Sequence, residues 1–285
     1  MDLPIILLDR GMVVERSGNI AAFPQIALEL LTQLDDEEGN LHLLVEQAKH
    51  DPVISGRLLG LANSAGLKTS GRQVNDIYSA MSLLGLSRVR QLVLSVSIRG
   101  AFRQLLSNGQ AAAFWEHSVD VAICAQVLAE HLGQHGDLAY ICGLLHDVGR
   151  LWLAHNFPDG YVAVDRHFRA RGDTGKAAAE RQAFGMDHAQ IGDVLGEIWN
   201  LPPLIRQAIL DHHGGPAMAD DPLVVLIHLA EAICQALHPT GYPIACLSPS
   251  IESVLHPNWE HMPYIYGEIE ARARLAKVEI QAMGG

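Results

Sequence analysis

Apolar residues recur at three- and four-residue spacing along most of the 285-residue chain. In the segment 52–63, Ile54, Leu58 and Ala62 fall on one face of a helix. No stretch shows convincing alternation of apolar and polar residues between tight hairpin turns, as a half-buried strand would. We therefore predict an all-α protein, with any strands confined to the first twenty residues.

Residues that start and stop helices support this prediction. Asp51-Pro52 and Asp221-Pro222 each place an acidic N-cap before a proline at the first helical position. Gly85, Gly133 and Gly185 each follow an apolar segment where a left-handed C-cap would lie. About a dozen helices are predicted, near residues 24–35, 40–49, 52–63, 75–84, 88–100, 110–132, 138–155, 159–171, 175–184, 188–199, 203–213, 222–237 and 263–282.

The length of the chain favours two helical lobes, because domains usually have about 100–200 residues. The segment Arg103–Ala113 is the most linker-like part of the interior, and the histidine-rich segments all follow it. A second irregular stretch, Pro239–Pro263, holds five prolines. We predict an N-terminal helical lobe over residues 1–108, a second helical lobe over 109–240, and a C-terminal extension with a last helix over 241–285.

Charge and composition narrow the function classes. The formal net charge of −12 weighs against nucleic-acid or membrane binding as a main role, because the molecule repels phosphate groups. The start Met1–Pro4 lacks the basic residues of a secretory signal, and no apolar run reaches the about 20 residues of a bilayer span. We expect a cytoplasmic protein. Four cysteines form no CxxC pair and are expected to be reduced core residues: Cys124, Cys142, Cys234 and Cys246.

The sharpest chemical signal is the segment Gly143–Arg150, with the sequence GLLHDVGR. Adjacent histidine and aspartate side chains on a helix project about 100° apart. His146 and Asp147 can therefore reach one ion only at the edge of the helix, with other helices supplying further ligands. By themselves the two residues are equally explained as a surface pair or a capped helix end.

Further imidazoles and carboxylates follow on successive predicted helices: His117, Asp187-His188, His212-His213 and Glu231. Each also has a structural explanation. His188 fits a first helical turn capped by Asp187, the pair His212-His213 complements a helix dipole, and Glu231 fits a polar stripe. Together they indicate a pocket for one or two divalent metal ions. Ligands of this mixed type suit iron, manganese, zinc or nickel.

The order His117, His146-Asp147 and a late acid resembles the signature of the HD phosphohydrolase superfamily. Other segments make the chain similar to the HDOD family over roughly residues 20–235. These segments are Leu61–Ala65, Ala80–Gly85, Phe114–Ser118, Glu180–Gly192 and Trp199–Pro202. The resemblance implies a two-lobed, multi-helical bundle like that of HD and HD-GYP phosphodiesterases. It also implies a regulatory role in bacterial signalling, exercised through a protein partner.

The resemblance to HD-GYP enzymes also implies a ligand set for two metal ions bridged by Asp147. Its members here are His117, His146, Asp147, His188, His212, His213 and, in place of the usual aspartate, Glu231. Ala113 stands where trinuclear relatives have a glutamate, so a third ion is not expected. Arg150 replaces the lysine usual after the His-Asp-x-Gly motif, and Gly214 replaces the glutamate that follows the paired histidines.

Two functions remain open at this point. The first is a signalling module that acts through protein contacts and keeps a metal pocket. The second is a metal-dependent phosphohydrolase acting on a nucleotide or cyclic dinucleotide, in which Asp147 holds the ions and Arg150 neutralises phosphate charge. Ligands that converge with a solvent-reachable position would favour the enzyme, whereas a closed pocket would favour the module.

Overall fold

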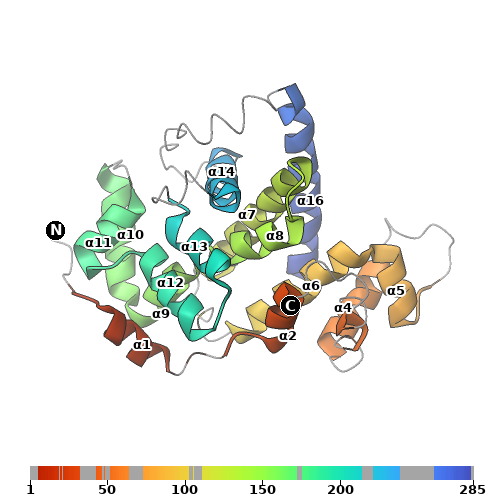
Figure 1. Ribbon diagram of the computed structural model, residues 1–285, viewed down its shortest axis with the longest axis horizontal. Helices are drawn as coiled ribbons and strands as arrows, with labels where there is room; N and C mark the ends of the chain where they lie inside the picture. The colour runs from red at the N-terminus through yellow and green to blue at the C-terminus, as the bar shows by residue number, and fades with distance from the viewer. Residues whose placement is uncertain are drawn as a thin grey trace. The chain divides into compact units, whose positions relative to one another are not determined.

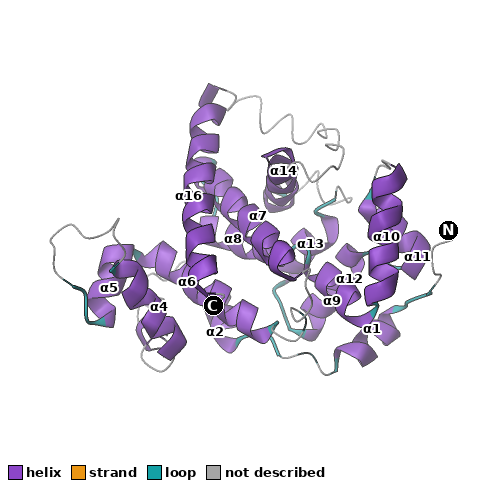
Figure 2. Cartoon of the chain, turned by 180° about the vertical axis from the view of Figure 1, so that it is seen from behind, coloured by secondary structure: helices purple, strands orange, loops and turns teal. Residues whose placement is uncertain are grey.

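The computed structural model confirms the all-α prediction (Figures 1 and 2). It describes residues 6–18, 20, 22–32, 43–46, 48, 52–63, 73–102, 105, 111–171, 175–213, 221–237 and 260–283. No strand occurs among these residues. They belong to two compact units, one formed by residues 1–20 and 103–281 and the other by residues 21–102 and 282–285. The boundaries predicted at 108 and 240 stay predictions, and Asp51, Gly214 and Cys246 lie outside the described residues.

The smaller unit contains four labelled helices: α2 (Gln25–Thr32), α4 (Pro52–Ala62), α5 (Ile77–Leu84) and α6 (Leu86–Ala101). Helix α6 packs against α2, α4 and α5. Asp76 caps α5 by accepting a hydrogen bond from the Ser79 backbone N–H at 2.8 Å, and Gly85, with φ of 84°, connects α5 to α6. None of the predicted metal ligands lies in this unit.

The larger unit carries all the predicted ligands. Its labelled helices are α1 (Arg10–Ser17), α7 (Ala111–His131), α8 (Gly136–Leu145), α9 (Val148–Asn156), α10 (Pro158–Arg171), α11 (Lys176–Phe184), α12 (His188–Ile198), α13 (Pro203–Asp211), α14 (Pro222–Leu237) and α16 (Met262–Met283). Helix α14 packs on α7 and α8, and α12 packs on α9 and α13 (Figure 1). The fold thereby brings the ends of several helices close together at one site.

Two predicted elements are corrected. The single helix expected over residues 138–155 is two helices, α8 and α9, because the chain turns at His146-Asp147. Asp147 leaves helical geometry with φ of −102° and ψ of 11°, and its carbonyl accepts a hydrogen bond from the Arg150 N–H at 2.8 Å. A helix that was not predicted, α1, lies among the first twenty residues: Asp9 caps it by accepting a hydrogen bond from the Met12 N–H.

Glycines allow the helices of the larger unit to approach closely. A Cβ on Gly149 would lie 2.0 Å from the His188 carbonyl oxygen, so α9 meets the first turn of α12 backbone to backbone. A Cβ on Gly143 would lie 2.6 Å from Ala122 Cα, where α8 crosses α7. Any larger residue at these positions would push ligand-bearing helices apart.

Two further observations on the described residues concern the cysteines and possible membrane spans. Cys124, Cys142 and Cys234 are free and buried, and burial raises the pKa of the Cys142 thiol. Among the described helices, no single one combines the length and apolar character of a bilayer span. Helices α5 and α6 meet the criterion only as a pair, which is bent by 111°.

Candidate metal centre

The structure brings all seven predicted ligands together from five parts of the larger unit. His117 lies on α7, His146 and Asp147 form the turn between α8 and α9, and His188 is the first residue of α12. His212 and His213 directly follow α13, and Glu231 lies on α14. Their ligand atoms form two neighbouring groups. We call these the three-histidine group (Asp147, His188, His212 and His213) and the two-histidine group (His117, His146 and Glu231).

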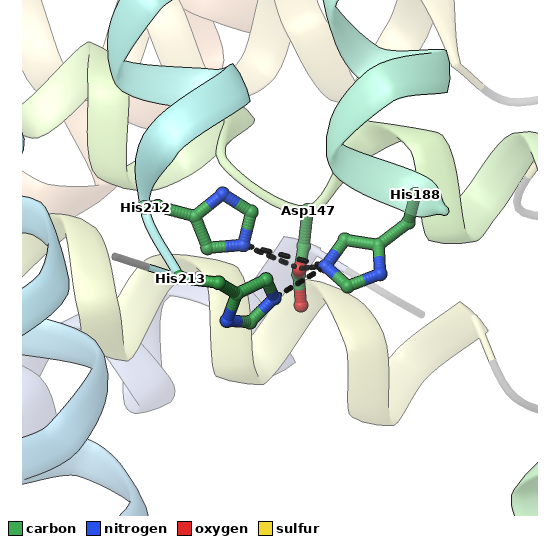
Figure 3. A group of neighbouring side chains, drawn as sticks. All are labelled: Asp147, His188, His212 and His213. Atoms are coloured by element: carbon green, nitrogen blue, oxygen red, sulfur yellow. Dashed lines mark hydrogen bonds and ion pairs between the residues drawn. The ribbon is translucent and has the colours of Figure 1, made fainter. Parts of the chain in front are cut away.

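The three-histidine group surrounds one carboxylate oxygen of Asp147 (Figure 3). Asp147 Oδ1 lies 3.2 Å from His188 Nε2 and 3.5 Å from His212 Nε2. His188 Nε2 lies 2.7 Å from His213 Nε2. The His188 ring comes from α12 and the His212 and His213 rings from the end of α13, and the three point toward a common centre, as the ligands of one ion do.

The two-histidine group faces the other oxygen of the same carboxylate. Glu231 Oε2 lies 2.9 Å from His117 Nε2 and 3.4 Å from His146 Nε2. Asp147 Oδ2 is 3.4 Å from His146 Nε2 and 3.9 Å from His117 Nε2. Asp147 therefore presents one oxygen to each group, which is the arrangement that bridging two ions requires.

Hydrogen bonds on the far side of three rings determine which nitrogen faces the centre. His146 Nδ1 donates to the Gly143 carbonyl and His212 Nδ1 to the Ile209 carbonyl, both at 2.7 Å. His188 Nδ1 donates to the buried carboxylate of Glu180. Because each Nδ1 donates outward, Nε2 is the nitrogen of each ring that faces the centre and can bind a metal ion, as in metal-binding histidines.

Unsatisfied buried atoms test whether these residues fit a metal pair. Among the described residues, four ligand atoms are buried without a hydrogen-bond partner: His117 Nε2, His146 Nε2, Asp147 Oδ1 and Glu231 Oε2. In addition, the Nε2 atoms of His188 and His212, neither of which has a proton to donate, lie 3.3 Å apart. Ion pairs between the imidazoles and carboxylates compensate such atoms in part, and a cation between them would satisfy the remaining lone pairs. The residues fit one divalent ion in each group.

The charges of the ligands match this use. Burial raises the pKa of Asp147, but the nearby Arg150 and His146 outweigh it and hold the pKa well below the usual value. Burial lowers the pKa of His188 well below the usual range, so this ring is neutral. Burial also lowers the pKa of His146, but Asp147 and Glu231 raise it overall to about 10. At His146 a proton therefore competes with a metal ion for Nε2.

Each group includes one ligand that solvent reaches. The His117 side chain is 30% exposed and His213 is exposed, whereas His146, Asp147 and His188 are buried. Beside them Arg150 Nη1 donates to Asp147 Oδ2. A small ligand could therefore approach either group while most of the centre stays dry.

Sequence reasoning missed two residues that shape the centre. Glu180 on α11 is buried, and its Oε2 accepts hydrogen bonds from both the ring and the backbone N–H of His188. Gly149 permits the contact of α9 with α12 described above. The sequence signal for Glu180 was weak: a histidine at a helix start needs a hydrogen-bond acceptor, but nothing in the spacing says where it comes from.

Comparison with known proteins decides the family. The family model of the HDOD domain matches residues 20–214, more than half of the chain. The chain belongs to the HDOD family. An HDOD domain protein of unknown function from Geobacter sulfurreducens has the same fold, with a TM-score of 0.66 and 25% identity over 96% of each chain.

Two curated proteins are also similar in sequence to this HDOD chain. An uncharacterized protein of Treponema pallidum is 27% identical over 223 residues, which cover 76% of this chain and 42% of that protein. Ribonuclease Y of Streptococcus agalactiae is 27% identical over 141 residues, 50% of this chain and 21% of that enzyme. The chain thus spans less than half the length of these relatives.

Proposed function

We propose that this HDOD protein is a metal-dependent phosphohydrolase that cleaves a phosphodiester bond at a pair of divalent ions. One observation carries the proposal: the two oxygens of the buried Asp147 carboxylate face two separate ligand groups. A purely structural ion would need only one of them.

The residues around the centre divide the work of hydrolysis. When bound, two ions act as Lewis acids and lower the pKa of a bound water. Asp147 holds the two ligand groups at a fixed separation. The hydrogen bonds of His146, His188 and His212 keep their rings oriented, with Nε2 toward the centre. Arg150, next to Asp147, offers a guanidinium to the phosphate oxygens, which it can contact through two parallel hydrogen bonds.

The expected substrate is a nucleotide or a cyclic dinucleotide. The name of the ribonuclease Y relative points to the phosphodiester as the shared chemical group. The net charge of −12 on this chain opposes the binding of long RNA, because every added phosphate increases the repulsion. A small phosphodiester meets the same centre with much less repulsion.

Hydrolysis assays paired with metal analysis test this function. Purified protein loaded with Mn²⁺ is assayed on bis-p-nitrophenyl phosphate, a cyclic dinucleotide and a linear dinucleotide. We expect turnover that chelation abolishes and that falls in Asp147→Asn by more than the about 100-fold expected for loss of an outer-shell partner. The matched control is Asp193→Asn, which changes a partly exposed carboxylate paired with Arg206. A metal-loaded wild type that cleaves none of the three substrates would refute the proposal.

A signalling module is the second candidate. Membership of the HDOD family favours it, and the compact unit of residues 21–102 contains no predicted ligand. In that case the ions stabilise the larger unit without turnover. Two bound ions, a lower melting temperature in Asp147→Asn and no hydrolysis would support the module. Location in the cytoplasm and a signalling partner stay predictions in both cases.

A further inference from the structure

We propose that the two metal positions are unequal. The three-histidine group binds the first ion tightly with Glu180 as its positioning residue, while Arg150 makes the two-histidine group a weaker, exchangeable position. The inference rests on the metal centre of the proposed function, but not on turnover. Its consequence is regulatory, since the supply of divalent ions to the second position would switch the centre between a one-ion and a two-ion state.

The ligand atoms already differ between the groups. The three-histidine group offers three imidazole nitrogens and one Asp147 oxygen. The two-histidine group offers two imidazole nitrogens, one Glu231 oxygen and the other Asp147 oxygen. Imidazole suits zinc, iron and nickel, whereas carboxylates favour harder, more weakly held ions such as manganese and magnesium. The first group is therefore the stronger site for most first-row ions.

Glu180 adds to this difference from outside the ligand set. Its side chain is fully buried, and one oxygen accepts hydrogen bonds from His188 Nδ1 and, at 2.9 Å, from the His188 backbone N–H. Two bonds to one residue fix the ring and the backbone that carries it. A carboxylate acceptor also makes the imidazole more basic than a carbonyl does. In the two-histidine group, the corresponding acceptor for His146 is only the Gly143 carbonyl.

The N-terminal cap of α12 also helps to fix the position of His188. Asp187 accepts a hydrogen bond from the Gln190 N–H at 2.8 Å, and the Gln190 side chain accepts one from the Asp187 N–H at 3.0 Å. This capping box fixes the helix start that carries His188. His188, a ligand of the first group, is thus held in place before any ion arrives.

Arg150 opposes the second ion directly. Its guanidinium donates to Asp147 Oδ2, the oxygen that lies 3.4 Å from His146 Nε2 in the two-histidine group. An ion entering this group meets a positive charge already bound to one of its ligands. Burial and the Arg150 charge lower the pKa of His188, but the hydrogen bond of Arg150 is to Oδ2 and not to Asp147 Oδ1, which lies among imidazole nitrogens.

The test is a metal titration of the full chain after removal of all metal with a chelator. Mn²⁺ alone is added, with calorimetry to give the affinities and electron paramagnetic resonance to separate isolated from coupled ions. For the wild type we expect two steps that differ at least about 10-fold, with an isolated-ion signal at one equivalent and a coupled signal at two. Glu180→Gln should weaken the first step about 10–100-fold and leave the second nearly unchanged.

Further variants assign the steps and protect the test against misfolding. Glu197→Gln on the same helix α12 removes an exposed carboxylate paired with Arg206 and should change neither step. His213→Ala, at an exposed position, should remove the first step, and Glu231→Gln the second. If Glu180→Gln loses its helical circular dichroism, the assignment by His213→Ala and Glu231→Gln still decides whether the tight step belongs to the three-histidine group.

Three results would overturn the inference. They are equal affinities in the wild type, an equal weakening of both steps in a folded Glu180→Gln protein, and a tight step that survives His213→Ala but disappears in Glu231→Gln. The failure of the proposed function has a different signature. Unequal steps without phosphodiester hydrolysis refute only the enzyme, and hydrolysis with equal steps refutes only the inequality.

Discussion

Replacing Arg150 by glutamine should destabilise the metal-free protein and make it unusually responsive to metal. Asp147 is buried, and Arg150 is its cationic partner with a side chain 14% exposed. Removing one member of a buried ion pair usually costs about 3–5 kcal/mol. His146, with a pKa raised to about 10, remains 3.4 Å from the Asp147 carboxylate and supplies a second positive charge. We therefore take the lower value, about 3 kcal/mol.

The loss can be read as a melting temperature. A domain of this size shifts by about 2–4 °C per kcal/mol, so metal-free Arg150→Gln should melt about 6–12 °C below the wild type. Saturation with Mn²⁺ should close more than half of this gap, because the ions replace the missing positive charge at Asp147. The second step of the metal titration should also tighten, since the guanidinium no longer opposes the ion.

Differential scanning fluorimetry of the metal-free and Mn²⁺-loaded proteins measures both effects. Arg206→Gln is the matched control: it removes a partly exposed arginine paired with Asp193 and Glu197, and such pairs contribute about 0–1 kcal/mol. A metal-free Arg150→Gln protein that melts within 2 °C of the wild type would refute the reasoning. So would a large gap that metal leaves unchanged, because the guanidinium would then have a role other than balancing the Asp147 charge.

Three further changes test the packing and electrostatics around the centre. Gly149→Ala places a Cβ 2.0 Å from the His188 carbonyl and should lower the unfolding free energy, measured in urea, by about 3 kcal/mol or more. The control Gly267→Ala, with nothing within 4 Å of the added Cβ, should be neutral or stabilising. Equal effects of the two substitutions would contradict the close approach of α9 and α12. Trp152→Phe removes a buried hydrogen bond of 2.9 Å to Ser17 Oγ and should cost about 1 kcal/mol by the same measurement, and an unchanged free energy would show that α1 is held by other contacts. In the chelator-treated protein, the pKa of His146 rises from 6.5 to about 10 on folding. Between these pH values the folded state keeps a proton that the unfolded state loses, so the melting temperature should fall as the pH rises. A melting temperature that does not change with pH would show that the His146 ring is not charged.

The all-α fold and the candidate ligand residues were accessible from the sequence because each has a local signal. Helical periodicity needs only neighbouring residues. The ligands stood out because histidines and acids recur on successive helices, from His117 to Glu231, where apolar residues would be expected. The structure brings these seven residues into two groups, although whether they bind metal stays a prediction until ions are measured.

The missing details depend on contacts between distant segments. The turn at His146-Asp147 interrupts an apolar pattern that continues on both sides, and it contains no proline to announce it. The close approaches at Gly143 and Gly149 become visible only when α7 and α12 are in place. Helix α1 was missed for another reason: glycine and adjacent valines in its sequence RGMVVERS disfavour a helix, and packing against α12 overrides this preference.

The position of each histidine on its helix explains why His188 needs Glu180 as a hydrogen-bond acceptor. His146 and His212 are the C-caps of α8 and α13, where the last carbonyls have no partner within the helix. Each ring therefore finds an acceptor three residues earlier, at Gly143 and at Ile209. These two ligands are oriented by their own helix ends.

His188 stands at the opposite end of a helix and has no such local solution. At a helix start the free backbone groups are N–H donors, and the carbonyls are committed to the helix. A ring there must take its acceptor from another segment, and that acceptor must also satisfy a free N–H. One carboxylate oxygen of Glu180 does both. Glu180→Gln should therefore disturb His188 alone, whereas no single side-chain substitution can remove the carbonyl acceptors of His146 and His212.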